Sequence, residues 1–137
     1  MGCGSVSHNV VKLVDAQALT VSGGATPSYT STWFPVEGWV EKAVTVDVDV
    51  ASGTPDVNID ILVSPYDYVT MRAATASTEN YSTVSVKDAQ TATVLTRYDS
   101  TDVPELATPM RSIAVKVTND SGAVAVSSVT VWVEGQS

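Results

Sequence analysis

Carboxylates are the most abundant side chains here that could bind a ligand or take part in a reaction. Asp47, Asp49 and Asp60 alternate with apolar residues in the segment AVTVDVDVASGTPDVNIDILV (43–63). Ca²⁺ takes about six to eight oxygen ligands, mostly from carboxylates and carbonyls. These three acids are expected to share the outer face of one β-hairpin and are weak calcium candidates, and Asp99, Asp102 and Glu105 form a second weak set in a loop. We favour a solvated acidic face that discourages edge-to-edge aggregation, and expect neither a metal nor a cofactor.

Other catalytic chemistry is poorly represented. The single histidine, His8, and the single cysteine, Cys3, lie in a small and polar N-terminal segment that we expect to be mobile. A mobile imidazole cannot be held beside a nucleophile, and one thiol cannot form an intrachain disulfide or a cysteine-based metal site. The sequence has no glycine-rich phosphate loop, HExxH or CxxC motif. We therefore expect a protein that is not an enzyme.

The charge of the chain argues against two classes of partner. Its 137 residues carry 7 basic and 15 acidic side chains, a net charge of −8, and the basic residues are scattered singly. Nucleic acids and anionic membrane surfaces both require concentrated positive charge, so we expect neither as a partner. No apolar run is long enough for a transmembrane helix, and no basic segment followed by an apolar one indicates a signal peptide.

Period-2 alternation predicts the elements that must position these residues. In two runs, 40–50 and 57–64, alternate side chains are β-branched and apolar, which places one face of a sheet in the core and the other in water. The short Gly- and Pro-containing connection between the runs predicts a β-hairpin. Further strands are expected at 9–14, 18–22, 29–34, 81–86, 91–98, 111–118 and 124–133.

About eight to ten short strands at regular turn spacing are typical of a sandwich or jelly roll. The fold class predicted is therefore all-β, an antiparallel β-sandwich of jelly-roll type with an extended N-terminal arm. The core is predicted to contain Val44, Val46, Val48, Val57, Ile59, Ile61, Ile113, Val115, Val117, Val131 and Val133.

Residues 1–30 are predicted to be the arm, and residues 31–137 the sandwich domain. The clusters 10–14 and 18–21 each bury too little apolar surface to offset the entropy of ordering them, so we expect other chains to order them by strand addition. Deleting residues 1–24 is then expected to leave the sandwich folded. The partner-binding candidates in the arm are Val10, Val11, Leu13, Leu19 and Val21.

Aromatic residues supply the remaining binding candidates. Trp132 lies between Val131 and Val133 and points away from those core valines. An exposed aromatic ring can anchor a sugar or a protein interface; coverage of Trp132 by a loop or by the second sheet is the alternative. Tyr66 and Tyr68 could form a sugar platform, although packing at the rim is the commoner explanation. The other two tryptophans, Trp33 and Trp39, are expected to plug the end of the sandwich.

The layout of the chain resembles the jelly-roll head decoration and auxiliary capsid proteins of tailed bacteriophages. The resemblance covers about residues 30–136 and is carried by the phrases FPVEGWVEKAVTVDVDV (34–50), DVNIDILVSPYD (56–67) and MRSIAVKVTNDSGAVAVSSVTVWVEGQ (110–136). It implies a non-enzymatic protein, often a homotrimer, on the capsid exterior. Such a protein assembles in the host cytoplasm and binds the major capsid protein, with its N-terminal segment reaching a neighbour.

Two alternatives remain open at this stage. One is a carbohydrate-binding β-sandwich that uses Trp132, Tyr66 or Tyr68, with or without calcium. The other is a bacterial surface or pilus-type subunit. Both functions require export, so the missing signal peptide favours the virion protein.

Overall fold

The computed structural model describes residues 8–21, 26–73 and 80–137. Cys3 and most of the predicted mobile segment therefore lie outside the described residues. The elements are β1 (His8–Leu19), β2 (Ser28–Thr30), β3 (Phe34–Pro35), β4 (Val40–Asp49), β5 (Val57–Ser64), α1 (Tyr68–Ala73), β6 (Ser82–Gln90), β7 (Thr96–Tyr98), the 3₁₀ helix η1 (Pro104–Ala107), β8 (Ser112–Asn119) and β9 (Val126–Gln136).

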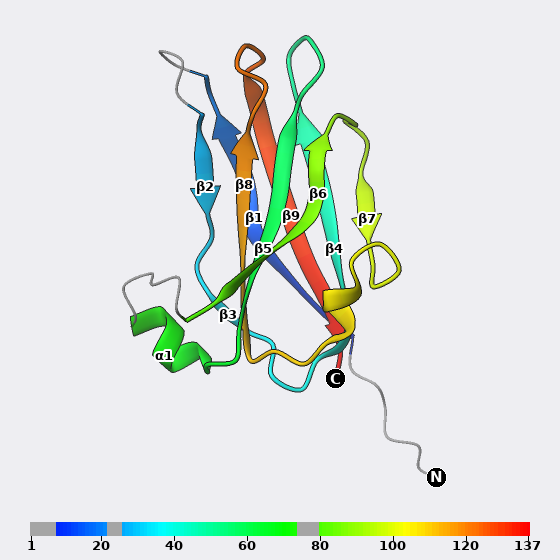
Figure 1. The fold of residues 1–137 in the computed structure, drawn as a ribbon. Helices are drawn as coiled ribbons and strands as arrows, with labels where there is room; N and C mark the ends of the chain where they lie inside the picture. Colours follow the sequence, from blue (N-terminus) through cyan, green and yellow to red (C-terminus); the bar gives the residue numbers. More distant parts are fainter. Residues whose placement is uncertain (1–7, 22–25, 74–79) are drawn as a thin grey trace.

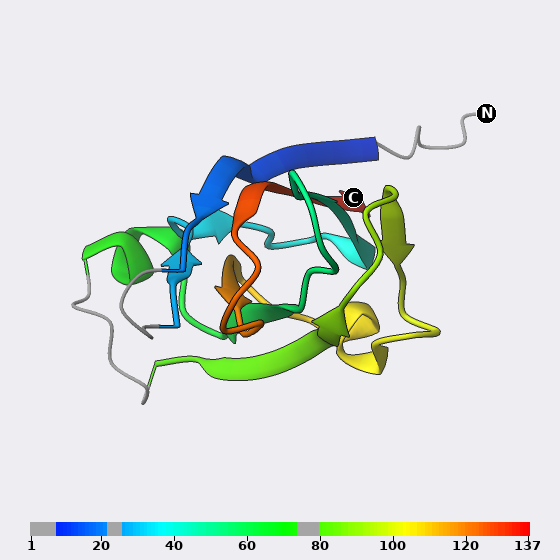
Figure 2. The same cartoon turned by 90° about the horizontal axis from the view of Figure 1, so that it is seen from above.

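The strands form two antiparallel sheets packed face to face, which confirms the predicted all-β sandwich (Figures 1 and 2). Sheet A has the order β1-β9-β4-β7. Sheet B has the order β2-β8-β5-β6, and the short β3 also pairs with β8. In Figure 1, sheet B lies in front of sheet A.

The strand pairs are nested, and this nesting defines a jelly roll. Strand β1 pairs with β9, β2 with β8, β4 with β7, and β5 with β6, each pair antiparallel. The chain therefore behaves as one long hairpin that is wrapped into two sheets, the arrangement of a double Greek key.

The predicted hairpin between the runs 40–50 and 57–64 is wrong, because β4 lies in sheet A and β5 in sheet B. The connection 51–56 is long enough to cross the roughly 10 Å between stacked sheets, and it lacks the two-residue Asn-Gly or Asp-Gly turn that would fold the chain back. The connection between β8 and β9 crosses in the same way. The two crossing loops pack together, because a Cβ on Gly53 (φ +88°) would lie 3.0 Å from a methyl of Val124.

The buried core matches the set predicted from alternation. All eleven residues predicted for it are fully buried, with 0% of their surface exposed. The core extends beyond that set through Val36, Val103 and Leu106, which lie in loops and in η1 and are also fully or almost fully buried. The two inner faces and the short loop elements together close one continuous core.

The prediction that residues 1–30 are an arm outside the sandwich is corrected by the first two strands. Strand β1 pairs with β9 from His8 opposite Gln136 to Leu19 opposite Val126, and β2 pairs with β8. Both Val14 and Leu19 lie in the core, with 0% and 2% exposed. Because Val14 and Leu19 are an odd number of positions apart, strict alternation would place them on opposite faces of the strand. Bulges in β1, with Ala16 at a positive φ of 47°, turn both residues inward.

A short helix, α1, follows β5. The Asp67 Oδ1 atom accepts a hydrogen bond from the Thr70 amide at 2.8 Å and so caps the start of α1. Met71, on the inner side of this helix, is 2% exposed. Within the described ranges, no helix is long and apolar enough to cross a membrane.

Candidate functional site

The structure does not bring the calcium candidates together. Asp47 and Asp49 lie on the outer side of sheet A, whereas Asp60 lies on β5 and faces outward from sheet B. The expectation that all three share one face was wrong because it rested on the hairpin that does not form. Residues 8–21, 26–73 and 80–137 contain no group of three or more acidic, histidine or cysteine side chains that could hold a metal ion.

The second acidic set has a structural role in its loop. Asp99 Oδ1 accepts a hydrogen bond from the Thr101 amide at 2.9 Å, and Asp102 Oδ2 accepts one from the Asp99 amide at 3.1 Å. The hydrogen bond from the Thr101 amide is the largest cause that lowers the pKa of Asp99. Both carboxylates therefore stabilise the turn between β7 and η1.

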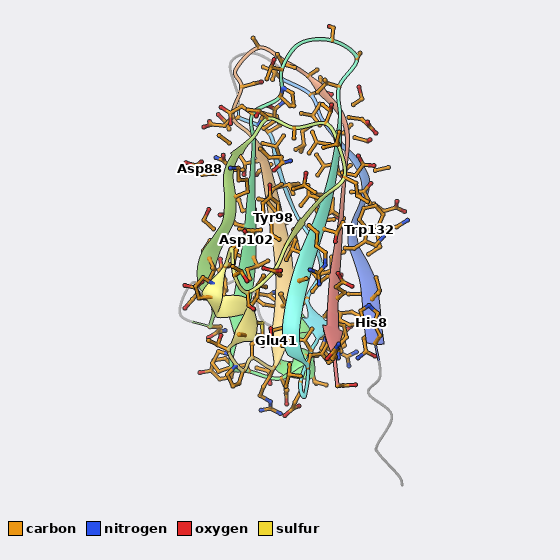
Figure 3. The ribbon with its side chains drawn as sticks, turned by 90° about the vertical axis from the view of Figure 1, so that its right-hand side faces the viewer. His8, Glu41, Asp88, Tyr98, Asp102 and Trp132 are labelled. Carbon is orange, nitrogen blue, oxygen red and sulfur yellow. The ribbon has the colours of Figure 1, made fainter. Side chains whose placement is uncertain are left out.

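Two of the predicted partner-binding residues do meet on the outer face of sheet A. Val10 and Trp132 line a shallow hollow of about 160 Å³, together with Thr45, Leu95 and Glu134. Val10 and Leu95 are 58% and 64% exposed. We call this hollow the sheet A groove; Figure 3 shows Trp132 on the β1–β9 side of the molecule.

The other predicted partner residues on β1 are placed differently. Leu19 is buried in the core, and Val11 and Leu13 pack against it, so these three stabilise their own chain. Val21, just beyond β1, is partly exposed. Alternation on the regular first half of β1 sends Val10 outward, and the later bulges bring Leu19 inward.

The Glu134 carboxylate on β9 contacts one side chain from each of two other strands at the edge of the groove. The Glu134 Oε1 atom accepts a hydrogen bond from Arg97 Nε on β7 at 2.7 Å, and Oε2 lies 2.9 Å from His8 Nε2 on β1. His8, which was expected to be mobile, is therefore part of the sheet. The hydrogen bond from Arg97 is the largest cause that lowers the pKa of Glu134.

We expect the Glu134→Gln variant to be less sensitive to acid than the natural protein. A lowered pKa means that Glu134 stabilises the fold fully above its ordinary value of 4.5, and that this stabilisation is lost as the pH falls through the folded-state pKa. At neutral pH the substitution should cost about 0.5–1 kcal/mol, because Arg97 is largely exposed and the pair is screened by solvent.

Urea denaturation from neutral pH to below 4.5 measures this difference. Glu37→Gln is the matched control, since Glu37 pairs only on the surface, with Arg111 at 3.0 Å. If Glu134→Gln lost as much stability on acidification as the natural protein, the contacts of Glu134 with Arg97 and His8 would make no pH-dependent contribution to stability.

A second concave region lies on sheet B, at a place where no binding site was predicted from the sequence. Trp33 and Tyr81 lie with ring centroids 5.6 Å apart and planes tilted by 56°. They line a hollow of about 240 Å³ with Thr30, Asp60, Leu62, Thr83 and Lys116. A neighbouring hollow of about 310 Å³ shares Thr30 and Trp33 and reaches Tyr68 and Arg72 on α1. We call the two hollows together the sheet B cleft.

The remaining predicted aromatic sites have simpler roles. Trp39 packs edge-on against Phe34 at 5.9 Å beside the core, at the end of the sandwich where a plug was expected. Tyr66 is 45% exposed, and the ring of Tyr68 is covered by the Arg72 guanidinium at 5.5 Å. Trp33, predicted as a second plug, instead belongs to the sheet B cleft.

Comparisons with known proteins match the fold and not the sequence. No protein-family model matches the chain, and no curated protein sequence matches it significantly. A chain in a structure of infectious bursal disease virus, strain Gx, superposes with a TM-score of 0.56 at 11% identity and covers 96% of this chain. VP2 in a subviral particle of that virus gives a TM-score of 0.56 at 12% identity over 94% of this chain.

This chain spans about one third of those structures, 33% and 32% of their lengths. The similarity therefore lies in a part of each larger chain. The protein therefore shares its fold with part of each of these virus chains.

Proposed function

We propose that this protein is a non-enzymatic structural component of a virus particle. The observation that supports this most directly is the nested jelly-roll topology, which matches chains of a virus and of its subviral particle over almost the full length of this chain. The strongly acidic surface also favours solubility before assembly and attraction to basic protein partners.

The finer proposal is that the protein decorates the outside of a tailed-phage head. In that role it binds the major capsid protein, forms a homotrimer and assembles in the host cytoplasm. Support for this comes from the resemblance of residues 30–136 to decoration proteins. Cryo-electron microscopy of the purified particle, together with light scattering of the free protein, tests it. Absence from the particle would overturn the proposal, whereas density on a tail or fibre would overturn only the head location.

The sheet A groove is the surface that we propose for attachment. Trp132 lines the groove with Val10 and Leu95, and these two apolar residues expose 58% and 64% of their surface; Val94, next to Leu95 in the sequence, exposes 68%. Interfaces concentrate their binding energy in a few aromatic and apolar residues surrounded by polar groups. The pair formed by Glu134 and Arg97 supplies such a polar rim.

We expect Leu95→Ser to weaken attachment to the particle by at least about thirtyfold. Loss of an apolar contact at the centre of an interface costs about 2 kcal/mol or more. Occupancy after incubation of the variant with particles that lack the protein is the measurement. Val69→Ser is the matched control, because Val69 on α1 is 59% exposed and lies outside the groove. Equal occupancy of the two variants would exclude the sheet A groove as the attachment surface.

A further inference from the structure

We propose that the sheet B cleft is a binding site for a neutral oligosaccharide, with Trp33 and Tyr81 as the stacking surface and Asp60 and Lys116 as the hydrogen-bonding pair. This site lies on the opposite sheet from the attachment groove. It does not depend on the proposed virion function.

The polar groups of the cleft are arranged in register across sheet B. Thr30 on β2 lies opposite Lys116 on β8, Lys116 lies opposite Asp60 on β5, and Asp60 lies opposite Ser85 on β6. Side chains at directly opposed positions share one face of a sheet. Four strands therefore present hydroxyl, ammonium, carboxylate and hydroxyl groups in one outward-facing row.

An apolar floor lies beside this polar row. Leu62 on β5 is opposite Ala114 on β8, and although both face outward they are only 5% and 0% exposed. Thr83, opposite Leu62 on β6, continues the second row. The cleft thus combines an apolar base with polar groups along one side, the composition of small-molecule sites.

The aromatic pair forms the wall of the cleft. Trp33 lines both hollows, and the tilted Tyr81 ring stands 5.6 Å from it, so two ring surfaces border the space above the apolar floor. Both side chains are only half-buried. The combined hollows reach the size range of ligand pockets, roughly 300–1,000 Å³. Sugar rings have apolar C–H faces that pack against such aromatic surfaces, while their edges carry hydroxyls.

The carboxylate and the ammonium both keep hydrogen-bonding capacity for a ligand. Neither Asp60 nor Lys116 forms a side-chain hydrogen bond or an ion pair within the described part of the chain. Partial burial is the main cause that raises the pKa of Asp60, opposed by the charge of Lys116 and assisted by that of Asp88.

The charges of the cleft select a neutral ligand that both donates and accepts. An ionised carboxylate only accepts hydrogen bonds and an ammonium only donates them, whereas each sugar hydroxyl does both. Neighbouring hydroxyls of one sugar can therefore satisfy Asp60 and Lys116 together through charge-assisted bonds. Because the cations Lys116 and Arg72 are balanced by Asp60 and by the nearby charge of Asp88, a charged ligand gains little from the cleft.

Titration of the ¹⁵N-labelled full chain with defined sugars tests the site. The neutral probes are cellohexaose, maltohexaose, mannohexaose and chitohexaose, and the charged comparators are sialyllactose and a heparin disaccharide. We expect at least one neutral probe to bind with a dissociation constant in the millimolar range or tighter. Its chemical shift changes should centre on Trp33, Asp60 and Tyr81. The proposal is overturned if no neutral probe binds at millimolar concentration, or if the charged sugars bind as well as the neutral ones.

Substitutions then locate the binding. Asp60→Asn should weaken it at least about tenfold, the usual effect of losing a charged hydrogen bond, and Tyr81→Ala should weaken it similarly by removing one ring. Asp47→Asn is the matched control, since it makes the same chemical change on the outer face of sheet A. Unchanged affinity in both Asp60→Asn and Tyr81→Ala would overturn the assignment to this cleft.

The same variants distinguish the proposed sugar site from the proposed attachment surface in the sheet A groove. Asp60→Asn should bind the particle normally, and Leu95→Ser should bind the sugar normally. Loss of sugar binding in Leu95→Ser alone would place the sugar in the sheet A groove and overturn the sheet B site, leaving the virion proposal to be decided by imaging.

Discussion

A chain that lacks residues 1–24 is expected to have no stably folded sandwich. The deletion removes β1, and with it the ladder to β9 and the buried side chains of Val14 and Leu19. Burial of each such side chain contributes roughly 1.5–3 kcal/mol, and the loss of the ladder also uncovers one side of β9. The total is a large part of the roughly 5–15 kcal/mol by which domains are stable. Circular dichroism melting of the truncated and full chains measures the effect.

Single substitutions on the same strand provide the control for this deletion. Leu19→Ala should destabilise the protein by about 2–4 kcal/mol through lost burial and a cavity. Val10→Ser should change stability by no more than about 0.5 kcal/mol, because Val10 is 58% exposed. A truncated chain that melted cooperatively near the temperature of the full chain would show that sheet A is stable without β1, and the original boundary near residue 30 would stand.

The second large effect is expected from Ile59→Ala in the centre of sheet B. Ile59 is fully buried and lies on β5 between β8 and β6, opposite Val117 and Lys87. Truncating a buried isoleucine to alanine costs about 2–5 kcal/mol, because the neighbouring strands cannot collapse into the space. Urea denaturation gives the loss as a lower midpoint with an unchanged slope.

Asp49→Ala is the surface comparison for this substitution. Asp49 is exposed and accepts a long 3.4 Å hydrogen bond from Ser128, so its loss should cost no more than about 0.5 kcal/mol. A cost below about 1 kcal/mol for Ile59→Ala would mean that the sheet B core repacks, contrary to the dense packing expected of protein interiors.

Alternation in the sequence predicts which residues are buried but not which strands pair. Val46 and Ile59 both lie in the core as predicted, because period 2 reports the face of each strand. Whether β4 and β5 pair or cross between sheets depends on the connection 51–56. Its length permits either outcome, and the hairpin prediction failed there. The assignment of Leu19 to a partner-binding arm was wrong for a related reason, because the bulge at Ala16 interrupts the alternation along β1.

In the candidate sites, too, the sequence predicts the direction of some side chains but not which distant segments come together. The outward direction of Trp132 follows from its two valine neighbours, and so one half of the sheet A groove could be predicted. Leu95 precedes the short β7 in an irregular segment, and its place beside Trp132 depends on pairing between distant parts of the chain. Trp33 and Tyr81 lie just outside regular strands, where no periodicity indicates a direction. Alternation in the runs 57–64 and 111–118 turns Asp60 and Lys116 outward, so the polar row of the sheet B cleft could be predicted, whereas its aromatic wall could not.

The nested pairing also sets the order in which the fold can close. The innermost pair, β5 with β6, joins segments that are near each other in the sequence, whereas the outermost pair joins His8 to Gln136. Closing a longer loop costs more entropy, and proteins with many distant pairings fold slowly. During synthesis, β1 leaves the ribosome before any other described strand, whereas its partner β9 is the last of the described strands to be made. Until then, the apolar side of β1 has no partner in its own chain, and β9 of a second copy offers it the same pairing.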